Sequence, residues 1–266
     1  MIRLAVRVAR PDAELALAEL LVLAPAGVEE VDLSPEVVEY AVYGAPGELP
    51  ELGELTAAVG GALVEVVSTE VGDDWAERWR EFHRPVQIGA VRLRAPWHEP
   101  GDGPEVVIDP GQAFGTGAHP TTRLCLELLL EQTPGGALAD LGCGSGVLAI
   151  AASKLGWDPV DGYDHERESV AATDENAAVN AVAVRAHRWD LRDDAIPEAP
   201  VVVANLLRPL LLTLAERMTA PPRTLVASGL LAHEADEIAA AFATRHGLAE
   251  TDRREAEGWA ALLLSR

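Results

Sequence analysis

The sequence predicts a doubly wound α/β domain that is preceded by a small ferredoxin-like α+β domain. From residue 106 onward, short apolar runs alternate with helix-forming segments, which is the pattern of a parallel sheet with helices between its strands. A turn with glycines at positions 142, 144 and 146 joins an apolar run to a helix-forming segment. Residues 1–70 instead show the order strand, helix, strand, strand, helix, strand, which is typical of a ferredoxin-like fold.

The composition is that of an ordinary globular protein. No apolar run approaches the ~18 residues that a membrane-spanning helix needs, and the first ten residues alternate in polarity rather than forming the core of a signal peptide. We therefore expect a cytoplasmic protein that does not bind membranes. Cys125 and Cys143 lack metal-ligand spacing, so we expect two reduced packing residues and no metal site.

The net charge is −22, because 43 acidic residues face only 21 basic ones. Such a field opposes binding to nucleic acid and favours a basic partner. An acidic surface can also serve solubility alone, and a single lysine among the basic residues indicates a compositional bias as readily as a function.

Residues 1–70 are expected to form a ferredoxin-like recognition domain. The pattern predicts strands at 2–8, 28–33, 37–43 and 62–68, with helices at 13–23 and 51–59. This segment carries 13 acidic residues and three arginines, a net charge of −10, and contains no cluster of catalytic residue types. A binding function is therefore favoured over a chemical one.

Residues 71–100 are expected to form a linker helix and a connecting strand. Asp73 or Asp74 can cap the helix, and Trp75, Trp79 and Phe82 then form one apolar stripe. We interpret this stripe as core packing between two domains, with substrate stacking as the alternative. Residues 86–96 have the pattern of a strand.

Residues 101–266 are expected to form the large α/β domain, which begins with a glycine-rich loop at 109–122. Three glycines and two prolines favour a loop, and Thr121 or Thr122 can cap a helix over 123–132. Glycines around Phe114 and His119, directly before the first buried strand, suggest a lid with an aromatic contact. The alternative is a simple long connection.

The glycine turn and two acidic residues predict a cofactor site. The spacing G-x-G-x-G lacks one residue of the dinucleotide fingerprint G-x-G-x-x-G. Asp140 precedes the turn, and Asp164 ends the next strand, where a carboxylate can accept hydrogen bonds from ribose hydroxyls. We take Asp140, Gly142, Gly144 and Asp164 as candidates for binding a nucleoside cofactor without a pyrophosphate, namely S-adenosylmethionine.

The rest of the chain completes the α/β pattern. Strands are predicted at 183–189, 201–204 and 224–228 and in two C-terminal runs, and helices at 169–180, 210–218 and 233–244. Asn205 ends the strand 201–204, at the sheet edge where ligands of such folds bind. This position favours a role in substrate binding over that of a buried capping residue.

Three motifs resemble those of the bacterial ribosomal protein L11 methyltransferase family, whose catalytic domain has the Rossmann-like fold of class I methyltransferases. The similarity covers roughly residues 72–266, whereas residues 1–70 agree only in element order. The loop motif is specific to the family, and the glycine motif is common to most methyltransferases. The motifs are Asp109-Pro110-Gly111-x-Ala113-Phe114-Gly115-Thr116-Gly117-x-His119-Pro120-Thr121-Thr122, Asp140-x-Gly142-Cys143-Gly144-Ser145-Gly146 and Val203-Ala204-Asn205-Leu206-Leu207.

The resemblance implies transfer of methyl groups from S-adenosylmethionine to lysine side-chain amines and to an N-terminal amine of a basic ribosomal protein. It further implies that Thr122, Gly142, Asp164 and Asn205 bind the cofactor. Phe114 and Thr116 fall in the family's lid and are cofactor-binding candidates too. The chain departs from the family at His165-Glu166-Arg167, where an apolar residue followed by Asp-Pro is expected.

The chemistry can also be argued from the residues. A sulfonium methyl group is already activated, so the enzyme chiefly aligns a neutral amine with it and excludes water. The Asn205 carbonyl oxygen can accept an amine hydrogen and direct the lone pair, which makes Asn205 the catalytic candidate. No strong general base is apparent, and His119 is either a base or a structural residue.

The sequence also allows alternatives to methylation of a ribosomal protein. A methyltransferase of another protein, of a small molecule or of nucleic acid would use the same cofactor motif. The acidic field opposes nucleic acid, and Asn205-Leu206-Leu207-Arg208 lacks the Pro-Pro-aromatic continuation of amino-adenine enzymes. A binding protein that has kept only the fold is the third alternative, and the intact loop motif and Asp164 argue against it.

Overall fold

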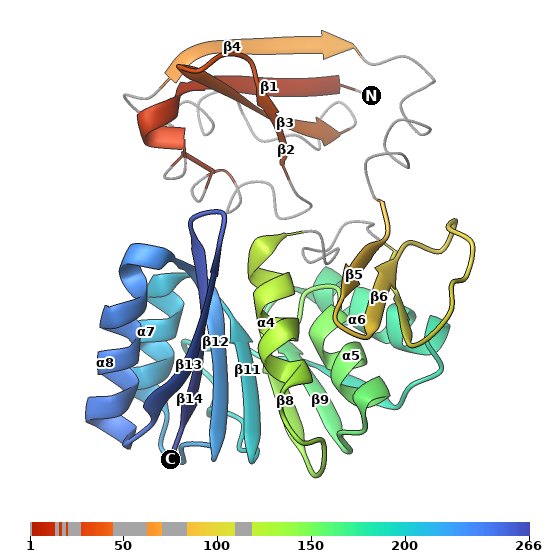
Figure 1. Ribbon diagram of the computed structural model, residues 1–266, viewed down its shortest axis with the longest axis vertical. Coiled ribbons are helices and arrows are strands. Elements are labelled where there is room, and N and C mark those ends of the chain that lie inside the picture. The colour runs from red at the N-terminus through yellow and green to blue at the C-terminus, as the bar shows by residue number, and fades with distance from the viewer. Residues whose placement is uncertain are drawn as a thin grey trace. The chain divides into compact units, whose positions relative to one another are not determined.

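A computed structural model describes residues 2–13, 16–17, 20, 28–44, 63–70, 84–109 and 119–266 (Figure 1). The chain divides into two compact units, Met1–Phe82 and His83–Arg266, which are described separately below. Within the described ranges, no helix is long and apolar enough to cross a membrane.

The first unit contains a four-stranded antiparallel sheet with the order β2-β3-β1-β4. Because β3 lies between β1 and β2, and β1 lies between β3 and β4, both long connections cross an intervening strand, as in the split βαβ arrangement. This order agrees with the ferredoxin-like prediction, and the second predicted helix, at 51–59, lies outside the described residues. The strands are β1 (Ile2–Ala9), β2 (Glu29–Asp32), β3 (Val37–Gly44) and β4 (Leu63–Glu70).

Alternation along β1 separates a buried face from a charged one. Leu4, Val6 and Val8 pack into a core with residues of β3 and with the helical residue Leu20. On the other face, Arg3 and Arg7 form ion pairs with glutamates of β2 and β3. A short 3-10 helix, η1 (Arg10–Asp12), follows β1.

The second unit begins with a small sheet of order β5-β6-β7, formed by β5 (Val86–Ile88), β6 (Val91–Arg94) and β7 (Glu105–Val107). The strand predicted at 86–96 is therefore two strands, separated at Gly89, whose φ of +53° permits the turn. Asn180 bonds both backbone groups of Val107, which ties this sheet to the large domain. The second unit starts at residue 83 and so includes these three strands. The linker expected from the sequence extends to residue 100 and overlaps the start of this unit.

The centre of the second unit is a seven-stranded sheet with the order β10-β9-β8-β11-β12-β14-β13. The first five of these are parallel, and β14 runs antiparallel to both β12 and β13. The order reverses between β8 and β11, which creates the crevice where ligands of open α/β sheets bind. The strands are β8 (Leu138–Leu141), β9 (Val160–Asp164), β10 (Val184–Arg188), β11 (Val201–Asn205), β12 (Thr224–Leu231), β13 (Ala249–Ala256) and β14 (Trp259–Ser265).

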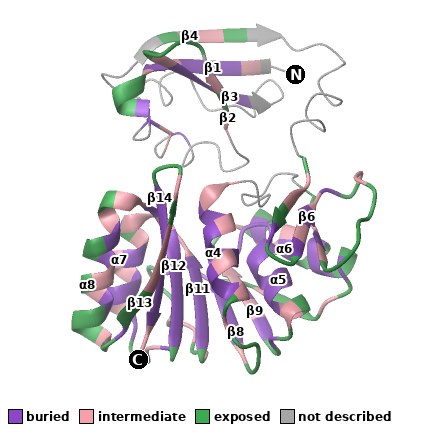
Figure 2. Ribbon diagram, viewed as in Figure 1, coloured by how far each residue is buried: buried purple, intermediate pink, exposed green. Residues whose placement is uncertain are grey.

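Helices cover both faces of this sheet, which confirms the predicted doubly wound, Rossmann-like fold (Figure 1). Strands β8 and β11 are buried almost throughout, as Figure 2 shows, because each is covered on both sides. One face carries α4 (Pro120–Leu130), α5 (Val147–Leu155) and α6 (Arg167–Val179), and the other carries α7 (Arg208–Arg217) and α8 (Ala235–His246), with η3 (Ala232–Glu234) before α8.

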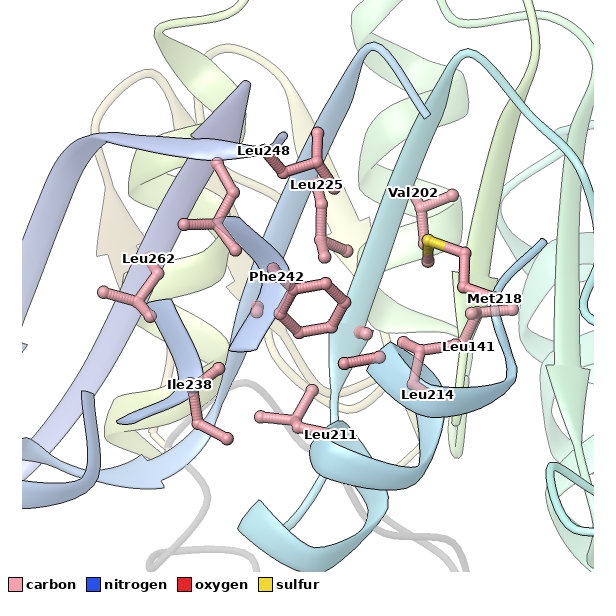
Figure 3. Packing of buried hydrophobic residues seen from close by; sticks show 14 of the residues in the cluster. Leu141, Val202, Leu211, Leu214, Met218, Leu225, Ile238, Phe242, Leu248 and Leu262 are labelled. Atoms are coloured by element: carbon pink, nitrogen blue, oxygen red, sulfur yellow. The ribbon is translucent and has the colours of Figure 1, made fainter. Parts of the chain in front are cut away.

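The main core lies between the sheet and the pair α7 and α8. Phe242 of α8 is fully buried and lies among leucines from α7 and β12 (Figure 3). Replacing a buried phenylalanine with alanine typically costs about 3–5 kcal/mol of unfolding free energy. This core holds β8 and β11 side by side and so fixes the position of the crevice between their ends.

The start of α4 differs from the prediction. The helix begins at Pro120, and the side chain of His119 caps it by accepting the Thr121 N–H, so the predicted cap at Thr121 or Thr122 is wrong. Proline is favoured at the first helical position because its fixed φ suits a helix and its missing N–H would have no partner there.

Candidate functional site

The glycine loop after β8 forms the floor of the candidate site. Gly142, Gly144 and Gly146 all have positive φ, between 53° and 80°. A Cβ on Gly142 would lie 2.5 Å from Cδ2 of Leu206, just beyond β11, so no larger residue fits without a shift. The N–H groups of Gly142 and Cys143 donate to the Tyr163 carbonyl at 2.8 and 3.1 Å, which joins the loop to the end of β9.

Asp164, at the end of β9, is buried and faces this loop. Its Oδ2 accepts the Gly144 N–H at 3.0 Å, and its Oδ1 accepts the Glu166 N–H at 3.0 Å. A carboxylate has about four lone-pair positions, so each oxygen keeps capacity for one more hydrogen bond. The arrangement suits an acceptor for two neighbouring hydroxyl groups, with backbone bonds fixing its orientation.

Asp140 lies beneath the loop and is fully buried. Its Oδ2 accepts the N–H of Ala149 in α5 at 3.1 Å, whereas its Oδ1 has no hydrogen-bond partner among the described residues. Burial raises the pKa of Asp140 to about 7, and the negative charge of Asp164 adds to the increase. A positively charged ligand nearby would favour the ionised carboxylate.

Polar residues on α6 support the glycine loop from behind, and they are not among the site residues predicted from the sequence. Thr173 Oγ1 donates to the Gly144 carbonyl at 3.0 Å, and Asn176 Nδ2 donates to the Ser145 carbonyl at 2.9 Å. Together with Asn180 they form a polar stripe at helical spacing on the buried side of α6. In the sequence, this polar stripe on a buried helix face could have indicated that these residues bond a neighbouring loop, because buried polar side chains require hydrogen-bond partners.

Asn205 ends β11 on the other side of the crevice and is half-buried. Its Nδ2 donates to Thr121 Oγ1 at 3.3 Å, and Thr121 Oγ1 lies 2.8 Å from His119 Nδ1. The His119 ring packs edge-on against Trp259, with centroids 4.9 Å apart. Burial lowers the pKa of His119 to about 4, with a smaller contribution from the Arg123 charge, so the ring is neutral at pH 7. Its capping bond supports the structural interpretation of His119 over that of a base.

Thr122 lies next to this group, and its side chain is fully buried. Its Oγ1 has no hydrogen-bond partner within the described part of the chain. A buried hydroxyl without a partner costs about 1–3 kcal/mol, so a ligand that bonds it would remove that cost. The predicted lid residues Phe114 and Thr116 lie outside the described residues.

Comparison with known proteins gives consistent matches. A family model described as "Ribosomal protein L11 methyltransferase (PrmA)" matches residues 49–266. A ribosomal protein L11 methyltransferase of Pseudomonas aeruginosa (strain LESB58) is 39% identical over 219 residues, which cover 78% of this chain and 73% of that protein. One of Burkholderia vietnamiensis (strain G4) is 34% identical and covers 99% and 97% of the two chains.

A solved structure gives a similar result. The crystal structure of a ribosomal protein L11 methylase from Lactobacillus delbrueckii subsp. bulgaricus superimposes with a TM-score of 0.63 at 29% identity. The match covers 68% of this chain and 98% of that one.

Proposed function

The chain belongs to the ribosomal protein L11 methyltransferase family, and on that premise we propose that it transfers methyl groups from S-adenosylmethionine to amine nitrogens of ribosomal protein L11. The observation that carries the proposal is the buried Asp164 carboxylate at the end of β9, held by the N–H of Gly144 in the loop that follows β8. The proposed target amines are those of lysine side chains and of the N-terminus of L11. Because the substrate is a ribosomal protein, we propose that the enzyme acts in the cytoplasm.

The residues present fit S-adenosylmethionine. Two buried acceptor or donor atoms, Thr122 Oγ1 and Asp140 Oδ1, have no protein partner among the described residues and lie beside the glycine loop or the start of α4. We propose that Asp164 binds the ribose hydroxyls and that Gly142 and Gly144 allow close approach of the backbone. Thr122, Asn205, Asp140 and the loop residues Phe114 and Thr116 complete the proposed cofactor-binding set.

S-adenosylmethionine supplies a methyl group on a sulfonium sulfur, so no protein group has to activate it. A substrate amine forms the new N–C bond with its lone pair while the S–C bond breaks and its electron pair stays on sulfur. The resulting ammonium then releases a proton to solvent. Because a lysine amine has a pKa of ~10.4, only its neutral fraction reacts.

Asn205 is the residue proposed to align the amine. Its Nδ2 donates to Thr121 Oγ1, and its carbonyl oxygen Oδ1 has no hydrogen-bond partner among the described residues. By accepting one amine hydrogen, Oδ1 would hold the nitrogen lone pair in line with the methyl group. A neutral carboxamide does this without a negative charge that would favour the unreactive ammonium.

Charge supports a basic protein substrate. The net charge of −22 includes −10 in residues 1–70, and an acidic field raises the encounter rate with a basic partner. We propose that residues 1–70 recognise the substrate, that residues 71–100 link the domains, and that residues 101–266 carry the methyltransferase site.

Mass spectrometry of ribosomal proteins tests the proposal. Purified large-subunit proteins are incubated with the enzyme and methyl-labelled S-adenosylmethionine, and labelled peptides are identified. We expect label on lysine and N-terminal amines of L11 alone. Label on a different protein would redirect the proposal to another protein substrate, and no label on any of them would contradict it.

A further inference from the structure

A chain of hydrogen bonds joins the start of α4 to the end of β11. It runs from His119 Nδ1 to Thr121 Oγ1 at 2.8 Å, and from Thr121 Oγ1 to Asn205 Nδ2 at 3.3 Å. Thr121 is fully buried, so water does not compete for its hydroxyl group. The bond between Thr121 and Asn205 spans 84 positions of the sequence. Through Thr121 it connects His119, the capping residue of α4, to the proposed aligning residue at the end of β11.

The direction of each hydrogen bond follows from His119. Its Nδ1 accepts the Thr121 N–H as the helix cap, so this nitrogen carries no hydrogen. The Thr121 hydroxyl must then donate to Nδ1, and its oxygen can only accept. The group that faces this oxygen is therefore the Asn205 NH2, and not its carbonyl.

The surroundings keep His119 neutral. Burial, together with a smaller contribution from the charge of Arg123, lowers the pKa of its ring to about 4. Arg123 is itself paired with Glu257 at 3.2 Å, and the His119 ring also packs against the uncharged Trp259. The direction of the bonds is thus the same across the pH range in which an amine methyltransferase works.

We propose that Thr121 is a positioning residue that orients the carboxamide of Asn205, so that the carbonyl oxygen faces the substrate amine. This inference rests on the function proposed above. A flipped carboxamide would place its carbonyl against an oxygen that has no hydrogen to give, and it would present an NH2 group to the amine. That NH2 group would compete for the lone pair that must attack the methyl group.

A purely structural role for Thr121 makes different predictions. If the residue only packs or caps, valine of the same shape should serve, because the His119 cap uses the backbone N–H of residue 121. If the hydroxyl group orients the Asn205 carboxamide, then Thr121→Val should lose that orientation, whereas Thr121→Ser, which keeps a hydroxyl group, should retain it.

Side-chain amide NMR measures the orientation without relying on activity. The chain contains only three asparagines, Asn176, Asn180 and Asn205, so selective ¹⁵N labelling gives three NH2 signals. We expect Thr121→Val to shift the Asn205 signal and to speed its hydrogen exchange, while Asn176 and Asn180 serve as internal references. An Asn205 signal unchanged in the folded variant would overturn the proposal.

Kinetics then test the consequence. We expect Thr121→Val to lower kcat by roughly tenfold or more, with the KM for L11 and the affinity for S-adenosylhomocysteine within about twofold. Thr121→Ser should recover most of the rate, and Thr251→Val, which removes a threonine hydroxyl on β13, should leave it unchanged.

A double variant tests whether Thr121 affects the rate through Asn205. If Thr121 acts through Asn205, then Thr121→Val combined with Asn205→Ala should be no slower than Asn205→Ala alone. Additive losses, or equal losses in Thr121→Val and Thr121→Ser, would overturn the positioning role. A wild-type enzyme that leaves L11 unmodified would contradict the proposed function instead, and the NMR result would still decide the orientation.

Discussion

Asp164 is the residue on which cofactor binding should depend most. Both of its oxygens are fixed by backbone N–H groups and keep one acceptor position each. Asp164→Ala should weaken binding of S-adenosylmethionine by roughly 1.5–3 kcal/mol, the range for a charged hydrogen-bond partner. Calorimetry measures this change. Asp161→Asn, on the same strand but paired with Arg185 and His187, is the matched control and should bind normally. Unchanged affinity in folded Asp164→Ala would remove Asp164 from the site.

Asn205 should matter to rate more than to binding. Loss of one positioned contact that forms mainly in the transition state is worth about 2–4 kcal/mol, or roughly 10²–10³ in kcat. Asn205→Ala should therefore lower kcat by that factor while the KM for L11 changes little. If only the KM for the cofactor changes and kcat is intact, Asn205 is a cofactor ligand and another group aligns the amine.

Asn205→Asp tests whether the side chain of residue 205 contacts the substrate amine or only fills space in the site. The added carboxylate favours the charged form of a nearby amine and so raises the pKa of that amine. The neutral amine then appears only at higher pH, so the pH profile of kcat should move upward relative to the wild type. Rate measurements across pH give the answer, and a profile that keeps its position while activity is retained would argue against contact between residue 205 and the amine.

At the scale of elements, the cap of α4 links pH to stability. The folded-state pKa of His119 is about 4, below its ordinary value of 6.5, so the unfolded chain binds a proton more readily between these two pH values. The stability that His119 contributes is present above about pH 6.5 and is lost as the pH falls toward 4.

His119→Asn should reduce this dependence, because asparagine also caps helices but does not titrate. Between pH 7 and 4 the wild type should lose on the order of 2–3 kcal/mol more unfolding free energy than the variant. Urea unfolding at several pH values gives this difference. Parallel pH curves for the two proteins would show that His119 titrates normally in the folded state.

The elements also show which parts of the fold a sequence can predict. The glycine turn and the alternation of apolar runs with helical segments locate the central strands from β8 to β12 within a few residues, because buried parallel strands and their turns have strong local patterns. The start of α4 is harder, since Thr121 and Thr122 are better caps by residue type than His119. Pro120 is the local signal that favours the earlier start.

Tertiary contacts explain the remaining differences at the site. The roles of Thr173 and Asn176 depend on α6 packing behind the loop, about 30 positions from the residues that they bond. The bond between Thr121 and Asn205 likewise needs two elements that only the folded sheet brings together. Residue types predicted the candidates Asp164 and Asn205, whereas the groups that orient them required the structure.

At the scale of the whole molecule, we propose that the acidic first unit recognises the substrate and that the second unit binds the cofactor. In the first unit, Arg3 and Arg7 are paired with glutamates, so the acidic excess is left for a basic partner. Deleting residues 1–82 should abolish methylation of intact L11 while S-adenosylmethionine binding survives, because the second unit has its own core. Circular dichroism and calorimetry control for folding. Full-rate methylation by residues 83–266 would show that the first unit does not recruit the substrate.

The most direct measurement is methyl transfer from labelled S-adenosylmethionine to purified L11, compared between the wild type and Asp164→Ala at one subsaturating cofactor concentration. We expect stoichiometric label on amine nitrogens of L11 with the wild type. With Asp164→Ala we expect initial rates lower by at least roughly tenfold, in proportion to its weaker cofactor binding. A folded wild type that binds the cofactor but leaves L11 unlabelled, or an Asp164→Ala variant as fast as the wild type, would contradict it.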